Sequence, residues 1–115
     1  MDMKKEILNV KGININQVVE DFCLYFSPDA KMVFSNESVR VVVVEKFFFR
    51  IKNDVAATVI FELRGQDIIN VHIVVAGGSD LMGFTFGVYK SMLKKIKKFF
   101  ENIGAKEFLE LSDEM

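Results

Sequence analysis

Two stretches of the chain place apolar residues at helical spacing, and the stretch between them alternates with the period of a strand. The first helix is expected to begin after Asn14, a good N-cap, with Gln17 completing a capping box. It ends at Ser27-Pro28-Asp29, because proline cannot continue a helix. The second spans Gly87 to Ile103 and stops at Gly104. The apolar stripe of the first helix comprises Ile15, Val18, Val19, Phe22, Cys23 and Phe26.

Between the helices, β-branched and aromatic residues alternate with polar ones, which predicts strands. The expected strands are a short one at Lys5–Val10 and four more at Lys31–Phe34, Val39–Ile51, Val55–Leu63 and Asp67–Ala76. The connections between the last four are too short for parallel crossovers, so the sheet is antiparallel. We therefore expect an α+β fold of β-α-β-β-β-β-α order, with a four- to five-stranded antiparallel sheet and a long C-terminal amphipathic helix packed on one face.

The domain organisation follows from this order. Residues 1–104 are expected to form a single α+β domain, because a chain of 115 residues fits one core. Residues 105–115 form an acidic C-terminal tail, expected to be frayed or lightly docked.

The alternation predicts one nearly apolar sheet face beneath the C-terminal helix. Odd-numbered residues are expected to form that face: Val39, Val41, Val43, Phe47, Phe49, Ile51, Val55, Ala57, Val59, Phe61, Leu63, Ile69, Val71, Ile73 and Val75. The second face is mixed, and its apolar residues are interface candidates: Val42, Val44, Phe48, Ile60 and Val74. In the expected register, Phe48, Thr58 and His72 form one cross-strand row, and Lys46, Ile60 and Asn70 form the next.

A glycine-rich turn follows the last long strand. Gly78 and Gly83 have the spacing of a P-loop, but Phe84 stands at the lysine position and Asp80 would repel a phosphate. The pattern therefore favours a backbone turn over a phosphate site. The segment Met82–Phe86 is then either a plain connector or a lid over a pocket.

Composition limits the remaining classes of function. Half of the residues are apolar and the net charge is −1, so the chain should fold and has no overall attraction for nucleic acid. Cys23 stands alone, which excludes an internal disulfide and fits a reducing cytoplasm. No stretch has the length of a membrane span, so we expect a cytoplasmic protein without membrane insertion. Four lysines and a glutamate form the polar side of the last helix, which is typical of a solvated face: Lys90, Lys94, Lys97, Lys98 and Glu101.

Two residues are candidates for chemistry. His72 is the only imidazole, but no nucleophile or acid accompanies it in a recognisable arrangement. Glu45 interrupts the expected apolar face, where a buried carboxylate could act as a general acid or base, although a β-bulge would turn it outward. No second histidine or cysteine lies near to complete a metal site, and no cofactor motif is present. The sequence therefore gives no positive indication of an enzyme.

The element order is similar to that of a shortened helix-grip domain of the START/Bet v 1-like kind, in which a curved sheet wraps a long last helix around an apolar cavity. The chain lacks the extra strands of such domains, and no residue roles are carried over. Two functions stay open. One is a non-enzymatic domain that forms a homodimer or binds a protein through the second sheet face. The alternative is a carrier of an apolar small molecule or lipid, with a pocket between sheet and last helix lined by Phe47, Phe61, Met82, Phe86, Met92 and Phe99.

Overall fold

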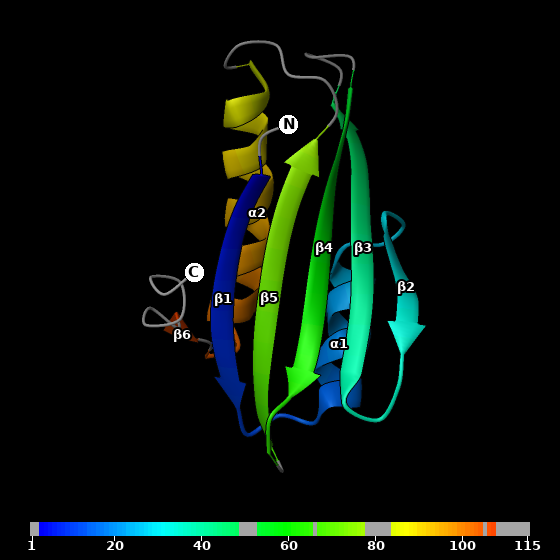
Figure 1. The fold of residues 1–115 in the computed structure, drawn as a ribbon, viewed down its shortest axis with the longest axis vertical. Helices are drawn as coiled ribbons and strands as arrows, with labels where there is room; N and C mark the ends of the chain where they lie inside the picture. The colour runs from blue at the N-terminus through cyan, green and yellow to red at the C-terminus, as the bar shows by residue number, and fades with distance from the viewer. Residues whose placement is uncertain (1–2, 49–52, 66, 78–83, 105, 108–115) are drawn as a thin grey trace.

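The computed structural model describes residues 3–48, 53–65, 67–77, 84–104 and 106–107. They form a sheet with two helices against it (Figure 1). The elements in chain order are β1 (Met3–Lys11), α1 (Ile15–Tyr25), β2 (Ala30–Ser35), β3 (Val39–Phe48), β4 (Asn53–Leu63), β5 (Ile68–Gly77), α2 (Phe84–Glu101) and β6 (Lys106–Glu107).

The sheet has the strand order β2-β3-β4-β5-β1-β6, and every pair of neighbours is antiparallel. The first strand therefore closes the meander by pairing with β5. This arrangement confirms the α+β fold and the antiparallel sheet predicted from the sequence. Neither described helix combines the length and apolar character needed to cross a bilayer.

The ends of the helices follow local sequence signals. The Asn14 side chain caps α1 by accepting hydrogen bonds from the backbone N–H groups of Asn16, at 2.8 Å, and Gln17, at 3.4 Å. The Gln17 side chain instead donates to Asp21 at 2.8 Å, so the predicted capping box was wrong. Beyond the end of α2, Gly104 adopts a φ of 92°, a backbone angle that glycine reaches without strain.

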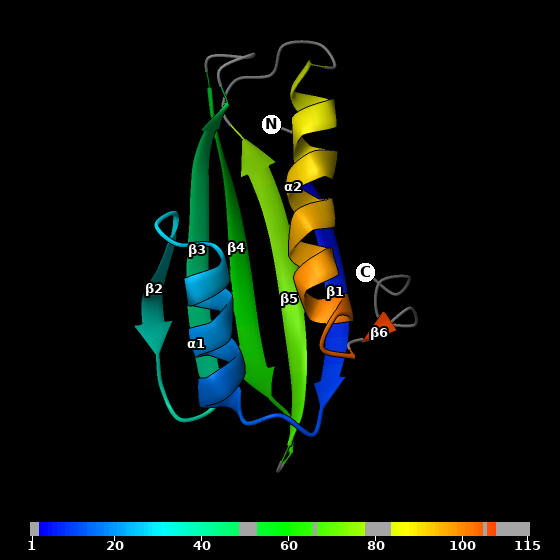
Figure 2. The same cartoon turned by 180° about the vertical axis from the view of Figure 1, so that it is seen from behind.

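The core lies between the sheet and the two helices, which cover the same face (Figures 1 and 2). Phe22 of α1 is fully buried at its centre, with its ring centroid 5.6 Å from that of Phe61 on β4. Its ring lies 5.3 Å from Phe99 and 5.5 Å from Phe100 of α2. These aromatic contacts join both helices to the sheet.

The register of β3 differs from the predicted one. On β4 and β5 the odd-numbered residues are buried, as expected, but on β3 the even-numbered Val42 and Val44 are buried instead. Val42 lies opposite Val59, and Val44 lies opposite Ala57, so these pairs share the helix-covered face. Valine occupies consecutive positions here, so the strand offers apolar side chains to both faces and the pairing decides between them. Placing Val42 and Val44 on the second face was therefore wrong.

Candidate functional site

No described element covers the side of the sheet opposite the two helices, which we call the open face (Figure 1). The pairings of the five long strands place alternate residues on it. Its apolar members are Ile7, Val39, Val41, Val43, Ala56, Ile60, Ile68 and Val74, and its polar members include Lys5, Asn9, Lys31, Glu45, Thr58, Glu62, Asn70 and His72.

The centre of the open face is an apolar band that crosses the strands. Val41, Ile60, His72 and Ile7 lie in one cross-strand row, and Val43, Thr58 and Val74 lie in the next. The valine and isoleucine residues of these two rows form the apolar band: Ile7, Val41, Val43, Ile60 and Val74. The rows predicted around His72 were wrong. The β4–β5 pairing is two residues away from the assumed register, and on β3 Phe48 lies opposite Asn53 and Lys46 opposite Val55.

The edge strand β2 continues the apolar band outward. Phe34 lies opposite Val41, and the β2–β3 register shifts between Met32 and Phe34. Met32, Val33 and Phe34 are 50%, 60% and 52% exposed, which is unusual for three consecutive large apolar side chains. The alternation of apolar and polar residues in the sequence indicates neither the bulge nor this exposure. The exposed apolar side chains of β2 were therefore not predicted.

A polar group interrupts and borders the apolar band, because His72 stands between Ile60 and Ile7 in their cross-strand row. His72 Nε2 lies 3.0 Å from one carboxylate oxygen of Glu62, and Arg64 donates to the other at 3.2 Å. The hydrogen bond from His72 holds the pKa of the Glu62 carboxyl below its usual range, with help from Arg64, and partial burial opposes the shift. Beside this group, Asn9 Nδ2 donates to the buried Asn70 at 2.9 Å.

Glu45 does not occupy the apolar interior. It is exposed on the open face opposite Ala56, and the β3–β4 pairing runs past it without a bulge. The shifted register of the whole strand, rather than a local bulge, places it outside. The carboxylate that contacts His72 is Glu62, so the structure does not join the two predicted candidates for chemistry.

No recognisable catalytic arrangement surrounds the Glu62–His72 pair. The one cysteine, Cys23, belongs to α1 on the other side of the sheet, where burial raises the pKa of its thiol. Within the described ranges, no three histidine, cysteine, aspartate or glutamate side chains gather closely enough to hold a metal ion. The pair can orient hydrogen bonds on the open face, where the hydroxyl residue Thr58 lies in the neighbouring cross-strand row.

The residues predicted to line a carrier pocket fall into two groups. Phe61, Met92 and Phe99 are almost fully buried and belong to the packed core. The Phe47 and Phe86 side chains, and Met82, lie outside the described part of the chain. A separate hollow of about 370 Å³ opens between the end of α1, β3 and α2, lined by Tyr25, Phe26, Ser27, Asp29, Val44, Met92 and Lys95.

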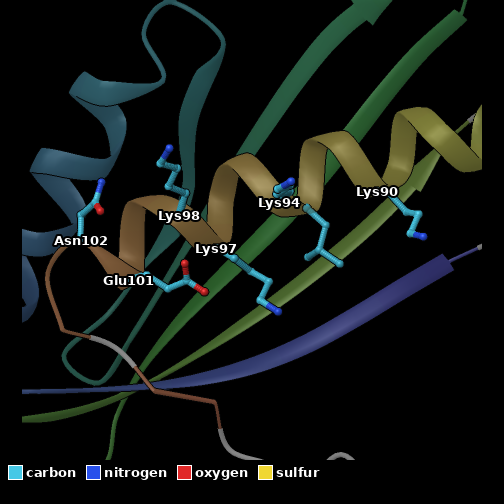
Figure 3. A pocket seen from close by; sticks show the side chains of 7 residues that line it. Lys90, Lys94, Lys97, Lys98, Glu101 and Asn102 are labelled. Carbon is cyan, nitrogen blue, oxygen red and sulfur yellow. The ribbon is translucent and has the colours of Figure 1, made fainter.

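The outer side of α2 carries a second feature, which we call the lysine surface. A shallow hollow of about 530 Å³ runs along it, lined by Lys90, Leu93, Lys94, Lys97, Lys98, Glu101 and Asn102 (Figure 3). Lys97 reaches toward β1, where its Nζ lies 3.5 Å from Glu6 Oε1. The polar side of the helix thus has the predicted composition, and one of its lysines connects it to the sheet.

Comparison with known proteins does not assign the chain to a family. No protein-family model matches the chain, and a search of curated proteins finds no significant match. The functional argument therefore depends on the surfaces described above.

Proposed function

We propose that this protein is a non-enzymatic domain that forms a homodimer through its open face. The observation that carries the proposal is the placement of both helices on one side of the sheet, which leaves the apolar band without a described cover. An antiparallel sheet with one side in water normally alternates apolar and polar residues. Here β3 supplies valines to both sides of the sheet. Val42 and Val44 lie on the helix-covered face, and Val41 and Val43 lie on the open face.

A second copy of this chain suits the open face because its border carries both signs of charge. Lys5 and Lys31 lie beside the apolar band, as do Glu45 and Glu62. A two-fold axis brings the same patch of both copies together, so a patch with both charges can complement itself. A partner with one dominant charge would match only half of this border.

The size of the open face agrees with a stable dimer. Five strands of 6 to 11 residues, spaced about 4.8 Å apart and rising about 3.3 Å per residue, give a flat area on the order of 700 Å² before side-chain relief is counted. Standard interfaces bury about 800 Å² from each partner. Contributions from the exposed Val33 and Phe34 of β2 would bring the area closer to this value. Two such sheets would pack face to face as in a β-sandwich.

The oligomeric state tests the proposal directly. We expect native mass spectrometry and light scattering of the full chain to give twice the monomer mass of 13.2 kDa. Ile60→Lys places a charge in the apolar band of both copies and should shift the protein to a monomer. The dissociation constant of the dimer should rise at least tenfold. Leu24→Lys is the matched control, because Leu24 is 68% exposed on α1 and should leave the dimer intact.

Two results would contradict the homodimer. One is a wild-type monomer at every concentration up to about 100 μM, which would leave the open face without a self-partner. The other is equal dissociation of the Ile60→Lys and Leu24→Lys dimers, which would place the interface elsewhere. Circular dichroism of both variants must show the wild-type fold.

A carrier of an apolar small molecule is the second candidate function. The hollow between α1, β3 and α2 favours it, because Tyr25, Phe26 and Met92 give apolar walls while Lys95 and Asp29 are polar. A monomer that binds a fluorescent fatty acid, and loses this binding in Tyr25→Ala, would support the carrier. A dimer that does not bind the probe supports self-association instead.

A further inference from the structure

The bulge in β2 brings two consecutive apolar side chains to one edge of the open face (Figure 1). Phe34 lies opposite Val41, a residue of the apolar band, and is 52% exposed. Val33 stands at the register shift between Met32 and Phe34, and it lines a hollow together with Val43 of the apolar band. A bulge redirects side chains that a regular strand would place on opposite faces. The open face therefore carries an exposed aromatic ring beside a recess.

The recess, which we call the edge hollow, has a volume of about 370 Å³. It is lined by Pro28, Asp29, Lys31, Val33, Val43 and Glu45. An apolar cavity of about 150 Å³ holds a benzene molecule, so the edge hollow is wide enough for a phenyl ring. Its proline and its two valines give apolar walls, and the ammonium group of Lys31 is suited to contact the face of an aromatic ring. The edge hollow thus fits an aromatic side chain of a partner.

The homodimer proposed above has few arrangements that match one apolar band to the other. Its two-fold axis lies in the plane between the facing sheets. Facing sheets pack with their strands aligned or at roughly 90°. A 90° crossing would bring the two bands together only at one point. Two aligned arrangements keep band on band, one with the axis along the strands and one with the axis along the band itself.

The charges on the open face distinguish these two arrangements. One cross-strand row has a lysine at each end: Lys31, Val43, Thr58, Val74 and Lys5. An axis along the strands, through the central strand β4, places Lys31 of each copy against Lys5 of the other. Like charges would then oppose each other twice. With the axis along the band, Lys31 faces Phe34 of the second copy and Lys5 faces Ile7, so no lysines meet.

We propose that the two-fold axis of the homodimer runs along the apolar band, so that β2 of each copy lies over β2 of the other and Phe34 enters the edge hollow of the second copy. This inference rests on the homodimer proposed above and assigns its geometry. The symmetry gives two equivalent contacts, each between a phenyl ring and a hollow. An aromatic side chain seated in a pocket typically carries a large share of the binding energy of an interface.

Single cysteines and a short bis-maleimide linker test the direction of the axis. In a Cys23→Ser background we expect Val33→Cys to give a linked dimer, because residue 33 lies close to the axis and to its counterpart. With the axis along the strands, four strand spacings of about 4.8 Å would separate residue 33 from its counterpart, and this dimer would not be linked. A mixture of Lys31→Cys and Lys5→Cys chains would be linked instead. Isotope labelling of one of the two chains identifies the mixed dimer by its mass.

The affinity of the dimer tests the role of the ring. Phe34→Ala should raise the dissociation constant at least about tenfold, because it empties both hollows. Met32→Ala is the matched control. Met32 is 50% exposed on the same strand, but it lies opposite Val42 on the helix-covered face, so its loss should change the dissociation constant less than about twofold. Light scattering over a dilution series measures both values.

Three results would overturn this geometry while the wild type still has the mass of a dimer. A mixed dimer of Lys31→Cys and Lys5→Cys chains would place the axis along the strands. A dimer linked in neither experiment would give the two copies another orientation. Equal effects of Phe34→Ala and Met32→Ala would remove the ring from the interface. A wild-type monomer is a different outcome, because it contradicts the homodimer itself.

Discussion

Glu62 and His72 are joined across β4 and β5, with His72 Nε2 3.0 Å from a carboxylate oxygen of Glu62. His72 stands between Ile60 and Ile7 in a row of the apolar band, Glu62 lies beside the band, and Arg64 contacts the second carboxylate oxygen of Glu62 at 3.2 Å. The open face therefore combines apolar residues with a charged border. Hydrogen bonds among His72, Glu62 and Arg64 hold the side chains of this border in place. Such a border can add specificity to an interface without supplying most of its affinity.

The lowered pKa of Glu62 predicts a pH-dependent contribution to stability. A carboxyl group with a lower pKa in the folded state stabilises the fold above its unfolded pKa, and this contribution disappears as the pH falls through the folded value. Glu62→Gln should therefore lower the free energy of unfolding by roughly 0.5–1 kcal/mol near pH 6, as expected for a partly exposed ion pair. The difference from wild type should shrink as the pH falls through the lowered pKa of Glu62, because the wild-type carboxyl then becomes protonated as well.

Urea unfolding at a fixed protein concentration, repeated from pH 3 to pH 7, measures this difference. Glu37→Gln is a suitable control because Glu37 is exposed in the turn between β2 and β3 and has no ion pair in the described structure. A difference for Glu62→Gln that stays constant over the whole pH range would show that the charge of Glu62 does not stabilise the fold.

The corrected register of β3 gives a second prediction. Val42 is fully buried beneath the helices, whereas Val43 is half-buried on the open face. Val42→Asp should therefore prevent folding or cost more than about 3 kcal/mol, because it buries an unpaired charge. In the monomer, at low protein concentration, Val43→Asp should cost only about 1 kcal/mol, mainly through lower β propensity.

The conservative pair Val42→Ala and Val43→Ala keeps the comparison measurable if the aspartate variant does not fold. We expect losses of about 2 kcal/mol for Val42→Ala and under about 1 kcal/mol for Val43→Ala in urea unfolding at low protein concentration. The opposite ranking would restore the odd-numbered register that the alternation of the sequence suggested.

The contrast between α1 and β3 explains how far the sequence could predict this molecule. In α1 apolar residues recur every three or four positions among polar ones, so periodicity identified the buried Ile15, Val18 and Phe22, although the apolar Leu24 lies exposed on the other side of the helix. In β3 both Val42 and Val43 are apolar, so periodicity could not select a face, and only the pairing with β4 does so. The helices and the fold class were thus predictable, but the pairing that forms the candidate site was not.

The same limit applies to the polar border of the site. Whether His72 meets Thr58 or Glu62 depends on an offset of two residues between β4 and β5, and such an offset leaves every side chain on its predicted face. The hydrophobic pattern is identical in both registers. The geometry of the connecting turn decides between them, and residue type alone determines it only in part.

The third prediction concerns Phe22, whose ring packs α1 against both α2 and the sheet. Its ring lies within 5.6 Å of those of Phe26, Phe61, Phe99 and Phe100. Phe22→Ala should remove these contacts and leave a cavity, at a cost of about 3–5 kcal/mol in urea unfolding. Phe22→Leu should cost about 1–2 kcal/mol, because it fills most of the volume but loses the aromatic contacts. Phe34→Ala on the exposed edge is the matched control and should cost less than about 1 kcal/mol in the monomer. If Phe22→Ala and Phe34→Ala were equally destabilising, the packing of α1 onto the sheet would not have the central role assigned to it.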